Sequence, residues 1–227
     1  MSEKGFKGMG MEGGVARWYA RTRQKDIHEF RRQAASVAAR LRSGAAVLEV
    51  APGPGFFSIE LAKLGNFQIT GLDVSHPFVQ IAAENAQNAK VDIAFRQGNA
   101  SEMPFPGNSF DFIYCSAAFK NFSEPVQALD EMCRVLRPSG EAWIADLRKD
   151  ASPDEVNSYV ADSGRNWFDA WMTKWTFKHV LLKRAYTSDD FRCMAGQSRF
   201  GACKISVSPI SLQVEFTKAP ELAVAAS

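Results

Sequence analysis

The chain has 227 residues, of which 46% are hydrophobic and 23% charged, a balance that excludes disordered and collagen-like classes. Its 27 Lys and Arg residues nearly balance 25 Asp and Glu residues, and the formal net charge of +2 makes no strong case for nucleic-acid binding. No stretch approaches the roughly 20 apolar residues of a membrane span, so no membrane partner is expected.

The predicted elements alternate between helix and strand over the first two thirds of the chain. The Gly-rich residues 1–14 are expected to be mobile. Apolar residues then recur at three- and four-residue spacing from Asp26 to Leu41, which predicts an amphipathic helix. Short β-rich runs predict strands at 46–51, 68–73, 91–96, 110–115 and 141–147. Between them, helices are predicted at 56–64, at 75–89 with Ser75 as its cap, and at 123–136 with Ser123 and Pro125 at its start.

Strands separated by helices of this length pair in parallel through right-handed crossovers, so the α/β fold class is predicted, with a Rossmann-like doubly wound sheet. In the last third, capping-box sequences at 152–155 and 187–190 predict two helix starts. Two β-like runs near 201–208 and 210–217 lie too close together for a crossover helix and are expected to form an antiparallel pair at one edge. The expected organisation is an N-terminal segment 1–44, a domain 45–218 with a helical cap insertion at about 152–185, and a disordered tail 219–227.

The cysteines and the N-terminus indicate a cytoplasmic protein. No apolar segment of a secretory signal precedes residue 15. The cysteines are far apart, without a C-x-x-C pair and without histidine at metal-ligand spacing, so reduced thiols and no metal are expected. They are Cys115, Cys133, Cys193 and Cys203.

The strongest local signal is the run V-L-E-V-A-P-G-P-G-F at 47–56, in which a strand passes directly into Gly53 and Gly55 and then a helix. Glycines let the backbone approach a ligand, and a helix N-terminus offers free N–H groups. Asp73, at the end of the next strand, can accept both hydroxyls of a ribose. These features fit a nicotinamide dinucleotide as well as S-adenosylmethionine. Ser58 at the third fingerprint position and the lack of a Y-x-x-x-K pair weigh against a dehydrogenase.

Five segments together resemble class I S-adenosylmethionine-dependent methyltransferases, in the small-molecule (type 11) group that includes ubiquinone/menaquinone-biosynthesis C-methyltransferases. They are E-V-A-P-G-P-G (49–55), G-L-D (71–73), R-Q-G-N-A-x-x-M-P-F (96–105), F-D-F-I-Y-C (110–115) and A-L-D-E-M-C-R-V-L-R-P-S-G (128–140). The resemblance implies an enzyme that moves a methyl group from S-adenosyl-L-methionine to a small-molecule acceptor by in-line displacement, leaving S-adenosyl-L-homocysteine.

The same resemblance implies which residues bind the cofactor. The methionine portion would lie against Glu49, Ala51, Pro52, Gly53 and Gly55, and its ammonium against the carbonyls of Cys115 and Ser116. Asp73 would bind the ribose. The adenine would lie between Val74 and Met103, with its edge at Asn99 and Ala100.

Two positions depart from the family pattern. Ala51 replaces the first glycine, which requires that its φ stay below zero. Asn99 replaces an aspartate, keeping an acceptor oxygen but losing the charge, so somewhat weaker cofactor affinity is expected.

The acceptor side is less well defined, and the sequence does not display a clear catalytic base. A base is required only when the acceptor is protonated. Substrate candidates are Tyr19 in the N-terminal segment, Lys120 and Asn121 after the fourth strand, Asp146 at the end of the fifth, and Trp171 in the expected cap. Each has an ordinary structural explanation as well, such as a solvated loop lysine or a packed aromatic helix.

The distribution of charge suggests what kind of acceptor binds. Residues 17–42 carry a local charge of +6, residues 43–164 one of −8, and residues 165–199 one of +4. The basic stretches are expected to dock against the acidic domain and to favour an anionic acceptor with an apolar or aromatic body. The alternatives are a nicotinamide-dependent oxidoreductase, an RNA or protein methyltransferase, and a fold that binds the cofactor without catalysis. The sequence C-S-A-A follows the fourth strand, where nucleic-acid methyltransferases carry an N-P-P-Y-type motif, and this disfavours the RNA methyltransferase but not the protein methyltransferase.

Overall fold

The computed structural model of the chain describes residues 14–162 and 182–221. Residues 1–13, 163–181 and 222–227 lie outside the described residues. The expectations of a mobile N-terminus, a Trp-rich helix and a disordered tail fall wholly or largely on those segments. None of the helices in the described ranges has both the length and the apolar character of a membrane-spanning segment.

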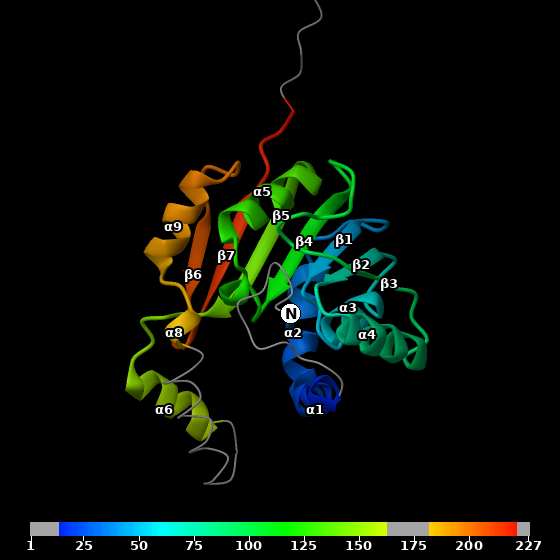
Figure 1. Cartoon of the computed structure of the whole chain (residues 1–227), viewed down its shortest axis with the longest axis horizontal. Helices are drawn as coiled ribbons and strands as arrows, with labels where there is room; N and C mark the ends of the chain where they lie inside the picture. The colour runs from blue at the N-terminus through cyan, green and yellow to red at the C-terminus, as the bar shows by residue number, and fades with distance from the viewer. Residues whose placement is uncertain (1–13, 163–181, 222–227) are drawn as a thin grey trace, which may run out of the picture.

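A single sheet of seven strands, in the order β3-β2-β1-β4-β5-β7-β6, forms the centre of the described structure (Figure 1). The strands are β1 Ala46–Val50, β2 Gln68–Asp73, β3 Ala94–Gln97, β4 Phe110–Ser116, β5 Leu136–Leu147, β6 Lys204–Val207 and β7 Ser211–Thr217. The first five pair in parallel, whereas β7 runs antiparallel to both β5 and β6. The predicted Rossmann-like sheet with an antiparallel C-terminal pair is therefore confirmed.

Two of the five parallel strands begin elsewhere than the sequence predicts. β3 starts three residues later, because the Val91 N–H still bonds to the Ala86 carbonyl at 3.1 Å and so belongs to the end of the preceding helix. β5 starts five residues earlier, because Leu136 already pairs with Phe110 of β4 before the register shifts.

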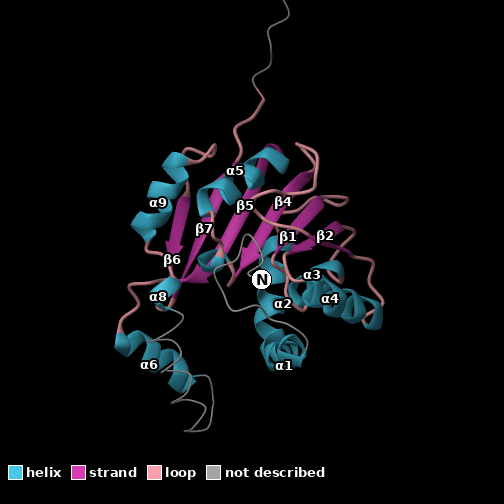
Figure 2. Ribbon diagram, in the orientation of Figure 1, coloured by secondary structure: helices cyan, strands magenta, loops and turns pink. Residues whose placement is uncertain are grey.

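Helices cover both faces of the sheet, as Figure 2 shows. α2, α3 and α4 pack on one face, and α5 and α9 on the other. The helices are α1 Gly14–Arg23, η1 Gln24–Asp26, α2 Ile27–Ala38, α3 Phe56–Ala62, α4 His76–Asn88, η2 Phe119–Asn121, α5 Pro125–Val135, α6 Pro153–Asp162, α8 Leu182–Arg184 and α9 Ser188–Gln197.

The helix α1 was not predicted from the sequence. Among the α1 side chains whose burial is described, Ala16 and Ala20 are buried, and they pack against Phe78 and Ile81 of α4. Two alanines at four-residue spacing give a weak apolar periodicity, so the predicted helix began only at Asp26.

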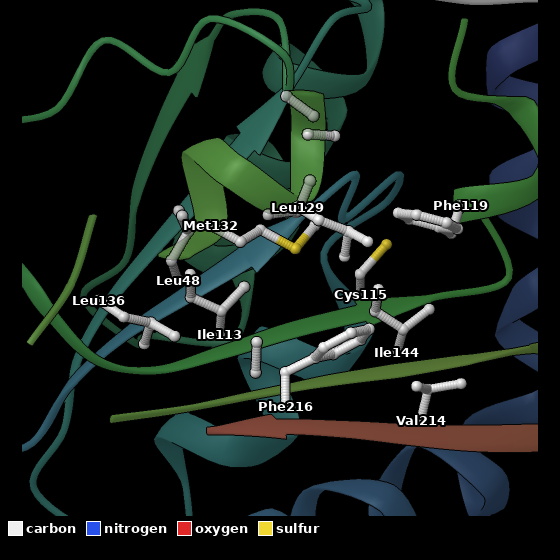
Figure 3. Close-up of a cluster of buried hydrophobic side chains, with 14 of the residues drawn as sticks. Leu48, Ile113, Cys115, Phe119, Leu129, Met132, Leu136, Ile144, Val214 and Phe216 are labelled. Atoms are coloured by element: carbon white, nitrogen blue, oxygen red, sulfur yellow. The ribbon is translucent and has the colours of Figure 1, made fainter. Parts of the chain in front are cut away.

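The larger core cluster lies between the sheet and α5. Figure 3 shows Leu129 and Met132 of α5 above Ile113 and Ile144 of the central strands. Phe119, in η2 just after β4, is fully buried in the same cluster. The core therefore anchors the segment that leaves the carboxyl end of β4.

The predicted helix starts are confirmed in part. Ser152 and Glu155 form a capping box, with N–H···O distances of 2.7 and 3.2 Å, and Thr187 and Asp190 form another, at 2.8 and 3.1 Å. Ser75 occupies the N-cap of α4, but its side chain makes no capping hydrogen bond. Ser123 lies one residue too early to cap α5, whose N-cap is Glu124 because Pro125 occupies the first turn.

The basic N-terminal region docks against the acidic domain, as the charge pattern predicts. Three arginines of residues 17–42 form ion pairs with domain carboxylates. They are Arg31 with Glu60 at 2.8 Å, Arg40 with Glu141 at 2.9 Å, and Arg42 with Asp111 at 3.1 Å. The arginines are at least half exposed, so each pair contributes at most about 1 kcal/mol.

Candidate functional site

The order of the strands reverses between β1 and β4, and a cavity lies at the carboxyl ends of the strands there. Ligands bind at this switch point in open α/β sheets. The wall is contributed by α1, by the start of α2 and by the loops that follow β1, β2, β3 and β4. Its members are Tyr19, Arg23, Phe30, Glu49, Val50, Ala51, Pro52, Gly53, Pro54, Leu72, Asp73, Val74, Ser75, Phe78, Gly98, Asn99, Ala100, Ser116, Ala117, Ala118, Asn121 and Phe122.

The loop after β1 has a left-handed backbone at three positions: Ala51 (φ 56°), Gly53 (φ 52°) and Gly55 (φ 77°). The expectation that Ala51 keeps a negative φ is wrong. Its N–H bonds to the Leu72 carbonyl at 2.8 Å and its methyl group packs on the core, which together hold the residue in this conformation. A non-glycine residue pays about 1–2 kcal/mol for it, a strain that is typical of functional loops.

Asp73 ties this loop to β2. Its carboxylate accepts the Gly53 N–H at 3.0 Å through one oxygen and the Ser75 N–H at 2.9 Å through the other. The residue is 6% exposed, yet it lines the cavity. A carboxylate is also the type of acceptor that the hydroxyls of a ribose require.

Glu49 is a second buried carboxyl group in the same cavity. It accepts hydrogen bonds from the backbone N–H of Ser58, at 3.2 Å, and from the Ser58 hydroxyl. Burial raises the pKa of Glu49 to about 7, with nearby Asp73 adding to the rise and the bonds from Ser58 opposing it. Ser58, which departs from the dinucleotide fingerprint, is thus the residue that holds this carboxyl in place.

Three residues of the loops after β2 and β3 line the side of the cavity predicted for the adenine: Val74, Asn99 and Ala100. The Asn99 side-chain oxygen accepts the Ser101 N–H at 3.0 Å, which fixes its direction. Met103 is 4% exposed in the core cluster and is not among the described residues of the cavity wall.

Two other predicted cofactor residues also lie behind the wall formed by the described residues. A Cβ on Gly55 would come within 3.0 Å of Ala82 and of the Phe95 ring, so this glycine permits close packing beneath the loop. Cys115 is fully buried in the core, and burial raises the pKa of its thiol. Its neighbour Ser116 does line the cavity.

The substrate candidates divide into two groups. Tyr19 and Asn121 line the cavity, and the Tyr19 ring meets Phe78 edge-on at 5.8 Å between centroids. Lys120 and Asp146 are not among the described residues that line the cavity. They form a buried ion pair with each other at 2.7 Å. The alternative explanation of Lys120 as a solvated loop lysine is therefore wrong. Trp171 lies outside the described residues.

Arg23 is the charged wall residue that the sequence did not single out. Its guanidinium bonds to Asp26 at 2.6 Å and lies over the Phe30 ring at 5.0 Å. It follows Tyr19 by four residues, so both lie on one face of α1. That spacing could have identified Arg23, had α1 itself been predicted.

Comparisons with known proteins find matches for the central part of the chain, which contributes most of the cavity wall. Residues 48–144 match the family model described as a methyltransferase domain. The chain is 36% identical over 122 residues to a demethylmenaquinone methyltransferase of Deinococcus radiodurans, covering 53% of this chain and 51% of that one. It is 32% identical over 122 residues to a ubiquinone/menaquinone biosynthesis C-methyltransferase of Bdellovibrio bacteriovorus, covering 53% and 52%. The chain thus spans about half the length of these curated relatives.

Solved structures agree on the fold over nearly the whole chain. A putative S-adenosyl-L-methionine-dependent methyltransferase from Methanococcus maripaludis matches with a TM-score of 0.72 at 18% identity, covering 96% of this chain and 100% of that one. A methyltransferase from Aquifex aeolicus matches with a TM-score of 0.60 at 19% identity, covering 86% and 88%. At such identities the likeness concerns the fold alone.

Proposed function

We propose, from the premise that residues 48–144 form a methyltransferase domain on the class I fold, that this chain is an S-adenosylmethionine-dependent methyltransferase acting on a small molecule. The observation that carries the proposal is the pair of buried carboxyls, Glu49 and Asp73, that face one cavity at the switch point. When bound, the cofactor supplies a methyl group already activated on a sulfonium.

The residues of the cavity fit that cofactor. Glu49 and Asp73 provide negative charge for an ammonium and acceptor oxygens for ribose hydroxyls. Val74 and Phe78 provide an apolar surface for a planar base. Asp73, together with Glu49 once it is ionised above about pH 7, disfavours the pyrophosphate of a nicotinamide dinucleotide, because like charges repel in a low-dielectric site.

We also propose that the acceptor is an apolar, aromatic molecule with an oxygen that carries negative charge. The cavity wall includes the aromatic rings of Tyr19 and Phe122, the cation of Arg23 and the carboxamide of Asn121. The Asn121 carboxamide makes no hydrogen bond within the described part of the chain, which leaves it available to orient a polar group. The relative from Deinococcus radiodurans is named as a demethylmenaquinone methyltransferase, and the one from Bdellovibrio bacteriovorus for ubiquinone/menaquinone biosynthesis.

These residues would align and shield the reacting groups without supplying a strong base. In-line displacement needs a fixed nucleophile and the exclusion of water more than proton transfer. Arg23 would stabilise an acceptor oxygen that is already ionised.

The free state of the four cysteines supports the cytoplasm as the place of action.

The cap insertion at 152–185 stays a prediction. The two helices that flank its undescribed middle, α6 and α8, lie beyond the sheet in Figure 1, at the end toward which the parallel strands point. α6 is held there by Arg148, at the end of β5, whose Nη2 bonds to Glu155 at 2.6 Å. This position is consistent with a cap near the acceptor.

The proposal is tested by two measurements on the full chain. Calorimetry should show binding of S-adenosylhomocysteine and no binding of NADH. A radiolabelled-methyl assay across quinols, phenols, amines and thiols should then show transfer to an aromatic acceptor. Binding of NADH alone would refute the function, and cofactor binding without transfer to any acceptor class would indicate a fold retained for binding.

The raised pKa of Glu49 makes cofactor affinity depend on pH. Between pH 4.5 and 7 the buried carboxyl holds its proton, whereas a bound ammonium favours the ionised form and expels it. The affinity for S-adenosylhomocysteine should therefore rise with pH by up to about tenfold per unit below 7 and level off above it. For the same reason the free energy of unfolding of the ligand-free protein should fall as pH rises through this range.

Glu49→Gln is the matched variant for this pH prediction, because it keeps the size of the side chain and removes the titration. Calorimetry between pH 5.5 and 8 should show weaker and pH-independent binding in that variant. A slope that persists in Glu49→Gln would assign the dependence to another group.

A further inference from the structure

Lys120 and Asp146 form a buried ion pair that the proposed chemistry does not use. The Lys120 ammonium donates to one oxygen of Asp146 at 2.7 Å, and the Lys120 backbone N–H donates to the other oxygen at 3.0 Å. The first oxygen also accepts the Leu147 N–H at 2.8 Å. The side chains are 5% and 2% exposed. Each carboxylate oxygen is therefore occupied by partners from within the protein.

The pair lies directly behind one wall of the cavity. From the last residue of β4 onward, the chain forms that wall with Ser116, Ala117, Ala118, Asn121 and Phe122. Ala117 has a left-handed backbone (φ 57°), and its N–H bonds to the Ala145 carbonyl of β5 at 2.7 Å. The same ammonium that binds Asp146 also donates to the Ala117 carbonyl at 2.6 Å. One side chain thus holds both the strained start of the wall and the end of β5.

This arrangement argues against a direct role for Lys120 in binding the acceptor. To reach the cavity, the ammonium would have to leave Asp146 as an uncompensated buried charge, which is strongly unfavourable. Phe119, fully buried in the core, fixes the residue before it. Asn121, the residue after it, is then directed into the cavity wall.

We infer that Lys120 and Asp146 are a positioning pair, which holds the segment 116–122 so that its wall residues meet the cofactor and Asn121 meets the acceptor. The inference rests on the proposed function, since it assigns a role within that site. It adds that Lys120 neither touches the acceptor nor transfers a proton, although it lies next to a residue that lines the cavity.

Two variants test the pair. Lys120→Met with Asp146→Asn removes both charges together, so no unpaired charge remains buried. Amide hydrogen exchange in residues 117–122 should become faster. The dissociation constant of S-adenosylhomocysteine should rise about tenfold, which is the effect expected from the loss of one hydrogen bond to the ligand. Exchange in β1 and β2 should stay unchanged. Arg31→Gln, which breaks the Arg31–Glu60 pair away from the cavity, is the control and should alter neither quantity.

Lys120→Arg separates positioning from catalysis, and it decides the matter even if the double variant fails to fold. Arginine keeps a cation beside Asp146 but cannot act as a base. Slow exchange, cofactor affinity within about threefold of wild type and retained turnover support positioning. Normal affinity with turnover abolished would overturn the inference, as would a double variant with wild-type exchange and affinity. If wild-type protein itself fails to bind S-adenosylhomocysteine, the proposed function fails instead.

Discussion

Replacing Asp73 with alanine should raise the dissociation constant of S-adenosylhomocysteine by about 100-fold, the expected loss of two hydrogen bonds to a charged acceptor. The variant would remove the acceptor for ribose hydroxyls and also the bonds that hold Gly53 and Ser75, at 3.0 and 2.9 Å. Asp73→Asn keeps one acceptor oxygen and should lose about tenfold. Isothermal calorimetry at pH 8, where Glu49 is ionised, measures both.

The control for this prediction is Asp92→Ala, which removes an exposed carboxylate before β3 and should leave affinity unchanged. Circular dichroism establishes whether Asp73→Ala still folds, since that variant leaves two backbone donors without their partner. Wild-type affinity in a folded Asp73→Ala protein would exclude the ribose role and leave Asp73 as a loop anchor only.

The sheet could be predicted from the sequence because its signals are local. Alternation of β-rich runs with helices of ordinary length fixes parallel pairing, and the short link between the last two runs forces them to be antiparallel. The helix α1 could not be predicted in the same way. Its burial depends on contacts of Ala16 and Ala20 with Phe78 and Ile81, which lie about 60 residues away in sequence.

The candidate site shows the same division. Asp73 and Gly53 are marked by spacing along the chain and do line the cavity, whereas Gly55, marked by the same spacing, packs beneath the loop. The partnership of Lys120 and Asp146 is invisible in sequence, because it depends on β4 and β5 ending side by side. Likewise, the φ of Ala51 is decided by its bond to the Leu72 carbonyl on a neighbouring strand and not by its own preference.

The second large effect concerns the packing beneath the glycine loop. A Cβ on Gly71, in β2, would lie 2.4 Å from the Phe95 ring and 3.1 Å from Pro52 of the loop. Gly71→Ala must therefore displace the ring or the loop, and the free energy of unfolding should fall by about 1–3 kcal/mol. Because the same ring would also meet a Cβ on Gly55, its displacement should weaken S-adenosylhomocysteine binding as well. Chemical denaturation and calorimetry measure the two losses.

Two further variants identify the cause of that loss. Gly196→Ala, in α9, makes the same chemical change where no atom lies within 4 Å, so its stability should stay the same or rise by up to about 1 kcal/mol. Phe95→Leu removes the obstructing ring. The double variant with Gly71→Ala should therefore lose less free energy of unfolding than the sum of the losses in the two single variants. Strict additivity would mean that Phe95 is not what Gly71 accommodates. A coupled result would establish that β2 supports the loop through this ring, so the geometry that Asp73 fixes by hydrogen bonds also depends on the absence of one methyl group.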